Sequence, residues 1–257
     1  MKRKLLSIIL LLSIGVTLNA YNYGTLEGNI KGCEDGNAKS CNDLAGDYLT
    51  GRFKLKDDDI KAQKFYDKSI SLYGKYCDEG DAKACFDLGD KYNGMRWGID
   101  QNYTIMMKYY MKSCKNGYGM ACYRLGMAYK KGTGLKKDKR KSKIYYDKAI
   151  LLYDIECDKG VGVSCKELKY IYQIGLYAKE DNIKAVEYLN KAFNVFEKEC
   201  DTNDAEGCYQ LASIYFLKKD YDKTKEIFKK SCKLGESDAC RRAKEIDIGR
   251  EKGFIPK

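Results

Sequence analysis

The sequence predicts an all-α protein built as a solenoid of six helix-turn-helix repeats. Twelve cysteines fall into six pairs with one spacing, apolar residues beside them recur with a helical period, and the only proline is Pro256. A single proline at the end of 257 residues is typical of uninterrupted helices and argues against a loop-rich β-sandwich. A hydrophobic content of 44% is enough for a packed core.

The first twenty residues predict a secretory signal peptide. Lys2, Arg3 and Lys4 precede an apolar run over residues 5–18, and Ala20 supplies the small residue expected at the cleavage site. The run is shorter than the roughly 20 apolar residues of a membrane span. We expect cleavage after Ala20, no later transmembrane segment, and a secreted or periplasmic product; an uncleaved N-terminal anchor is the alternative.

The cysteine pairs predict disulfides that close tight turns. The two cysteines of every pair are eight residues apart. In one continuous helix that spacing spans about 12 Å, whereas a disulfide requires Cα atoms within about 7 Å. The chain must therefore reverse within each pair, and glycine lies three residues after the first cysteine in five pairs, with Asn203 in the remaining one. A metal site would need closer ligands. The expected bonds are Cys33–Cys41, Cys77–Cys85, Cys114–Cys122, Cys157–Cys165, Cys200–Cys208 and Cys232–Cys240.

Amphipathic helices are predicted on both sides of each turn. After the turn, Cys41, Leu44, Ala45 and Tyr48 follow the i, i+3, i+4, i+7 pattern, and the same pattern recurs in later units. Its tyrosine, expected in the core, recurs as Tyr48, Tyr92, Tyr129, Tyr172 and Tyr215. A single solenoid is expected over residues 21–257, with repeats at roughly 21–50, 57–93, 101–130, 138–173, 181–216 and 220–247.

The repeat length is hidden by insertions. The first cysteines of the pairs recur after 44, 37, 43, 43 and 32 residues. Aligning the first helices on a recurrent lysine (Lys68, Lys112, Lys148, Lys191, Lys230) leaves a period near 36 and seven extra residues before Cys77, Cys157 and Cys200. Seven residues are two helical turns, so the buried face keeps its phase. We predict that these three helices are longer by two turns.

The repeat resembles a known family. Lys131-Gly132-Thr133-Gly134-Leu135, followed by Ser142, Tyr145, Tyr146 and Lys148-Ala149, is similar to the Sel1-like repeat, a relative of the tetratricopeptide repeat. With the regular cysteine pairs, the chain resembles the Helicobacter cysteine-rich protein family. The resemblance implies a right-handed superhelix with a groove, and β-lactam binding with weak β-lactamase activity. The proline usual in the inter-repeat loop is absent here.

The residues themselves do not identify an enzyme. The chain has no histidine, which excludes Ser-His-Asp, Cys-His and histidine-zinc sites. No serine is followed by lysine three residues later, and Ser-Asp-Asn and Lys-Thr-Gly are absent. Whether the protein is an enzyme therefore stays open, with no catalytic residue assigned and no cofactor or metal expected. The alternative function is a non-catalytic scaffold that binds protein or cell-wall glycan.

Two further features point to ligands. Arg96 and Trp97 lie in a loop that needs no tryptophan, either as an exposed ligand contact or as a lid over the repeat junction. Six of the eight residues 136–143 are basic, either as a solvated face without a specific partner or as a contact for an anionic partner. The formal net charge is +11, three of it within the predicted signal peptide. Expected partners are a β-lactam or peptidoglycan-derived ligand, or a peptide in the groove. Anionic cell-wall or lipid surfaces are compatible with the charge, nucleic acid is not expected outside the cytoplasm, and the protein is expected to be a monomer.

Overall fold

The computed structural model describes residues 25–56, 58–94 and 101–256, and the predicted signal peptide lies outside them. Within this part of the chain the structure is helical and has no strand, which confirms the predicted all-α class. The first helices of the hairpins, called A helices here, are α1 (Leu26–Glu34), α3 (Asp59–Asp78), α5 (Tyr103–Lys115), α7 (Lys139–Asp158), α9 (Asn182–Asp201) and α11 (Tyr221–Lys233). The second helices, called B helices, are α2 (Ala38–Thr50), α4 (Ala82–Lys91), α6 (Gly119–Lys131), α8 (Gly162–Ile174), α10 (Ala205–Leu217) and α12 (Ser237–Glu251). A short 3₁₀ turn, η1 (Arg52–Lys54), follows α2.

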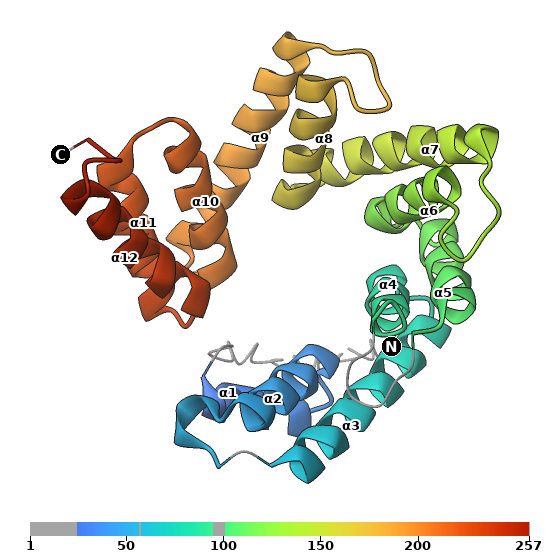
Figure 1. Ribbon diagram of the computed structural model, residues 1–257, viewed down its shortest axis with the longest axis horizontal. Helices are drawn as coiled ribbons and strands as arrows, with labels where there is room; N and C mark the ends of the chain where they lie inside the picture. The colour runs from blue at the N-terminus through green and yellow to red at the C-terminus, as the bar shows by residue number, and fades with distance from the viewer. Residues whose placement is uncertain (1–24, 57, 95–100, 257) are drawn as a thin grey trace, which may run out of the picture.

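The helices stack in chain order into a solenoid. Each B helix packs against the A helix of its own hairpin and against the A helix of the next. The stack bends through an open arc with α1 and α12 towards its two ends (Figure 1). In that view α4 and α6 lie on the inner side of the arc, and α5 and α7 lie on its outer side. Packing between consecutive hairpins leaves the inner and outer surfaces of the stack open to partners.

A disulfide closes the turn of every hairpin. The six bonds join the cysteines in sequence order, with Cα–Cα distances from 4.4 to 4.8 Å. The turns depend on a left-handed residue, with φ of +102° at Gly80 and +63° at Asn203. No free cysteine is found in the described residues. Six disulfides are typical of proteins outside the cytoplasm.

Three A helices are longer than the others, as the sequence predicts. α3, α7 and α9 have 20 residues each, whereas α5 and α11 have 13. Four of the five recurrent lysines that set this register, all except Lys148, bridge consecutive A helices. Lys68 Nζ donates to the Cys33 carbonyl at 2.8 Å, and Lys112 and Lys191 pair with Asp78 and Asp158 at 2.7 Å. These lysines reach the C-terminal end of the preceding A helix, where a cation is favourable.

The recurrent tyrosine of the B helices packs against the next hairpin but lies nearer the surface than expected. Of the five, Tyr129 alone is buried and the others are half-buried. Tyr48 stacks on Phe65, Tyr92 on Tyr109, Tyr129 on Tyr145 and Tyr172 on Tyr188, with ring centroids 5.5 to 6.0 Å apart. The deep core is formed instead by A-helix rings, including Tyr66, Tyr146, Tyr153 and Phe196.

None of the helices described is both long enough and apolar enough to cross a bilayer.

Candidate functional site

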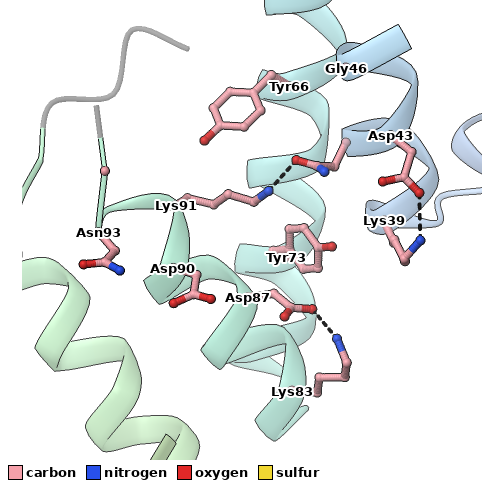
Figure 2. A pocket seen from close by; sticks show the side chains of 12 residues that line it. Lys39, Asp43, Gly46, Tyr66, Tyr73, Lys83, Asp87, Asp90, Lys91 and Asn93 are labelled. Atoms are coloured by element: carbon pink, nitrogen blue, oxygen red, sulfur yellow. Dashed lines mark hydrogen bonds and ion pairs between the residues drawn. The ribbon is translucent and has the colours of Figure 1, made fainter. Parts of the chain in front are cut away.

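The candidate site is a pocket of about 590 Å³ between the first two hairpins. α2 and α4 form its walls, and Tyr66 and Tyr73 of α3 form its floor (Figure 2). Both tyrosines are buried, because the ring of each lies under the two B helices. The remaining lining side chains are polar or charged, with glycine at two positions: Lys39, Asn42, Asp43, Gly46, Lys83, Asp87, Asp90, Lys91, Asn93 and Gly94.

The pocket alternates cations with carboxylates. Lys39 pairs with Asp43 at 2.8 Å, and Lys83 pairs with Asp87 at 2.7 Å one hairpin later (Figure 2). Burial raises the pKa of the Asp87 carboxyl, and the hydrogen bond from Lys83 opposes that rise. The pair repeats because lysine and aspartate occupy the same two positions around the second cysteine of both the first and the second hairpin. The walls therefore present matched cation and anion sites to a bound molecule.

Lys91 connects the two walls above the floor. Its ammonium lies 5.3 Å from the Tyr66 ring centroid and 5.6 Å from that of Tyr73, within the range of cation–π attraction. It also donates to the side-chain oxygen of Asn42 on the opposite wall (Figure 2). Burial raises the pKa of the Tyr73 hydroxyl, so this floor residue stays protonated at neutral pH.

In the third and fourth hairpins the first and third of these B-helix positions lose their charged or small residues to apolar or aromatic ones, and the middle position stays charged. Counted from the second cysteine of each hairpin, Lys39, Asp43 and Gly46 correspond to Met120, Arg124 and Met127 on α6. Lys83, Asp87 and Asp90 correspond to Val163, Glu167 and Tyr170 on α8, and Ile174 lies one turn beyond. Val163, Tyr170 and Ile174 are all exposed. We call these B-helix positions, with the pocket between α2 and α4, the inner face.

A tyrosine covers the floor of the junction between the third and fourth hairpins. Tyr146 occupies the place that Tyr66 has in the first pocket. Tyr177, from the loop after α8, stacks on Tyr146 and meets Tyr123 edge to face. The Lys130 ammonium lies 5.0 Å from the Tyr177 ring centroid. Tyr177 has a φ of +66°, which an L residue adopts only where its surroundings hold it. The equivalent of the open pocket is thus closed by an aromatic side chain.

The ligand contacts predicted from the sequence, Arg96 and Trp97, lie outside the described residues. In the sequence they come two and three residues after Gly94, which lines the pocket. Among the residues described, no three His, Cys, Asp or Glu side chains are grouped as a metal site requires. The sequence analysis missed the inner face. Comparing the residues two positions before and five positions after each second cysteine reveals where it becomes apolar.

Comparison with known families identifies the repeat. The family profile described as "Sel1 repeat" matches residues 38–73, 82–118, 119–154, 161–194 and 205–236. The chain belongs to the Sel1 repeat family. Each matched Sel1 repeat consists of a B helix and most or all of the following A helix, so the pocket is formed jointly by the first and second Sel1 repeats. α1 and α12 flank the five matched repeats.

Matches among solved structures include three proteins of low overall similarity. The chain is 23% identical to a Sel1 repeat protein from Oxalobacter formigenes, covering 86% of this chain and 83% of that one with a TM-score of 0.42. It is 16% identical to c5321, a protective antigen of uropathogenic Escherichia coli with an SLR fold, covering 87% and 67% with a TM-score of 0.31. It is 19% identical to the immunity protein Pa5087 of Pseudomonas aeruginosa, covering 66% and 72% with a TM-score of 0.36. No curated protein matches the chain.

Proposed function

We propose that the protein is a non-catalytic scaffold, exported from the cytoplasm, that binds a segment of a partner protein along its inner face. The observation that carries this proposal is the change of the inner face over consecutive repeats, from lysine and aspartate to aliphatic and aromatic residues at two of its three positions. The fold does not require either character at these two positions, because the same hairpin forms with Lys83 and Asp90 as with Val163 and Tyr170. Residues that vary freely on a constant backbone are where repeat proteins place recognition.

The chemistry of the inner face defines the expected partner. The cations and carboxylates between α2 and α4 suit a segment that carries both charges, and Asn42 and Asn93 suit backbone amides. The exposed Val163, Tyr170 and Ile174 on α8 suit aliphatic or aromatic side chains. We therefore expect a peptide with a charged portion and an apolar portion, bound across at least three hairpins.

Selection from a phage library of random dodecapeptides tests this proposal. Peptides enriched on the oxidised protein are measured for their Kd against three variants. Val163→Asp with Ile174→Asp breaks the apolar part, Lys39→Ser with Lys83→Ser breaks the charged part, and Glu187→Ser with Asn194→Ser alters the outer surface as a control. We expect the first two to weaken binding about tenfold or more, equivalent to about 1.4 kcal/mol. Equal binding to all four proteins would show that the inner face is not the site.

β-Lactam binding is the second candidate, because the resemblance to the Helicobacter cysteine-rich proteins implies it and the pocket is large enough for a small molecule. Among the described residues the lining offers lysines for a carboxylate but no serine, threonine or cysteine. Tyr73 is a poor nucleophile while its pKa is raised by burial. We therefore propose that any β-lactam binds without acylation. Mass spectrometry after incubation with benzylpenicillin, alongside a chromogenic cephalosporin assay, checks this; an adduct on one residue or measurable turnover contradicts it.

A further inference from the structure

One of the three long A helices has an apolar outer surface. Ile144, Leu151 and Ile155 of α7 are 56%, 60% and 42% exposed. They are separated by seven and four residues, so they form a row along one side of the helix. The buried residues of α7, including Tyr146 and Tyr153, lie on its opposite side. The row therefore faces away from the solenoid core, and none of its three residues belongs to the core cluster.

The other two long helices show that the fold does not need this row. Counted from the cysteine that ends each helix, the same three positions are Lys64, Ser71 and Lys75 in α3. In α9 they are Glu187, Asn194 and Lys198. All six side chains are exposed. Polar residues thus serve at these positions in two of three helices of equal length, and α7 alone replaces all three with aliphatic residues.

The same helix also has the most basic surroundings. Arg140 and Lys148, both exposed, flank the row of aliphatic residues on the same side of α7. Lys136, Lys137 and Lys139 lie at the start of the helix and are exposed as well. In the described part of the chain none of these five cations forms an ion pair. The segments that lead into α3 and α9 are instead acidic, with Asp57, Asp58 and Asp59 in one and Glu180 and Asp181 in the other.

The carboxylates of α7 do not cancel this charge. Asp147 pairs with Lys143 at 2.8 Å, and Asp158 pairs with Lys191 of α9 at 2.7 Å. Asp154 accepts a hydrogen bond of 2.6 Å from the Tyr188 hydroxyl. Glu156 accepts from the Gly119 backbone N–H at 2.9 Å and from the Ser164 hydroxyl. The acidic groups are therefore engaged within the protein, whereas the cations beside the row are available to an outside anion.

We propose that the outer face of α7, formed by Arg140, Ile144, Lys148, Leu151 and Ile155, docks on an anionic lipid surface. A row of aliphatic residues flanked by Lys and Arg is the composition with which helices bind at the membrane interface, by inserting side chains between headgroups that attract the cations. α7 lies on the outer side of the arc, whereas α4 and α6 lie on its inner side (Figure 1). Docking there leaves the inner face open to its own partner.

Vesicle co-sedimentation tests the proposal with the oxidised chain of residues 21–257. The probes are vesicles of phosphatidylglycerol and phosphatidylethanolamine at 1:3, and vesicles of phosphatidylcholine alone. We expect binding to the first, little to the second, and weakening by salt. Ile144→Lys with Leu151→Ser and Ile155→Lys gives α7 the residues of α3. This variant adds two positive charges, so a loss of about tenfold or more in binding is attributable to the aliphatic row.

Matched variants separate the two contributions and the competing explanations. Lys136→Gln with Lys137→Gln and Lys139→Gln is expected to weaken binding about tenfold while leaving the row intact. Ile60→Ser with Leu217→Ser removes exposed aliphatic side chains elsewhere and is expected to bind like the unmodified protein. Circular dichroism verifies that each variant is folded. The proposal is overturned if the anionic vesicles do not bind, if the row variant binds as well as the unmodified protein, or if the row mediates self-association in sedimentation equilibrium instead.

Discussion

The junction between the first two hairpins and the junction between the third and fourth are built on the same backbone and end in opposite surfaces. Both place two B helices over a long A helix with buried tyrosines, Tyr66 and Tyr73 in one and Tyr146 and Tyr153 in the other. In the first, charged walls enclose an open pocket. In the second, Tyr177 covers Tyr146. Fold and recognition are thus encoded at different positions of one repeat.

The largest expected effect comes from removing what the two junctions share. Reducing the six disulfides is expected to cause a cooperative loss of helix well below the melting temperature of the oxidised protein, because each nine-residue ring contributes roughly 2–3 kcal/mol. Circular dichroism at 222 nm during heating, with and without dithiothreitol, measures the difference. Coincident melting curves would mean that packing alone holds both junctions.

Alkaline pH is expected to produce the next largest effect. Burial raises the pKa of the hydroxyls of Tyr73, Tyr146 and Tyr153, and raises that of Tyr118 to about 12. In the unfolded chain these groups lose their protons near pH 10, whereas in the folded protein they keep them. The native state then binds more protons, so the free energy of unfolding falls as the pH rises above 10. Urea unfolding at pH 8 and pH 11 tests this, with absorbance at 295 nm following tyrosine ionisation. Equal stability at the two values contradicts it.

Two glycine substitutions contrast the junctions directly. A Cβ at Gly126 of α6 lies 2.7 Å from ring carbons of Tyr146, whereas a Cβ at Gly46 of α2 has nothing within 4 Å. Gly126→Ala is therefore expected to lower the free energy of unfolding by about 1–3 kcal/mol through overpacking. Gly46→Ala is expected to raise it by up to about 1 kcal/mol through helix propensity. Urea titrations of both variants measure the change in the free energy of unfolding, which is expected to be negative for Gly126→Ala and positive for Gly46→Ala. A loss of similar size in both would contradict the proposed difference in packing at the two glycines.

The smallest effect is expected from removing the ring that closes the junction between the third and fourth hairpins. Tyr177→Ala removes the ring over Tyr146 and is expected to lower the free energy of unfolding by about 0.5–1.5 kcal/mol, since an aromatic pair is lost. It is also expected to make Tyr146 reactive towards nitration, detected by peptide mass spectrometry. Tyr66→Phe, a conservative change in the open junction, is the control for general loosening. Unchanged protection of Tyr146 in the alanine variant would show that α6 and α8 cover it without the loop.

The sequence predicted the fold because its determinants are local and repeated. The spacing of the cysteines, the glycines between them and the two-turn extensions before Cys77, Cys157 and Cys200 are all readable along the chain. The inner face was not predicted, because its character depends on which side of each B helix looks inward. The contact of Tyr177 with Tyr146 had no local signal, since it joins a loop to a helix in the preceding part of the chain. Arg96 and Trp97 remain untested as ligand contacts.

The disulfides also divide the backbone into segments in which a single proteolytic cut has different consequences. Each bond closes a ring of residues around a turn, as between Cys114 and Cys122, and each longer loop between hairpins, such as residues 132–138, lies outside every ring. A cut within a ring leaves the two ends covalently joined, whereas one cut in a connecting loop separates the chain into two pieces. Proteolysis at these loops is therefore expected to release whole hairpins, each retaining its own disulfide.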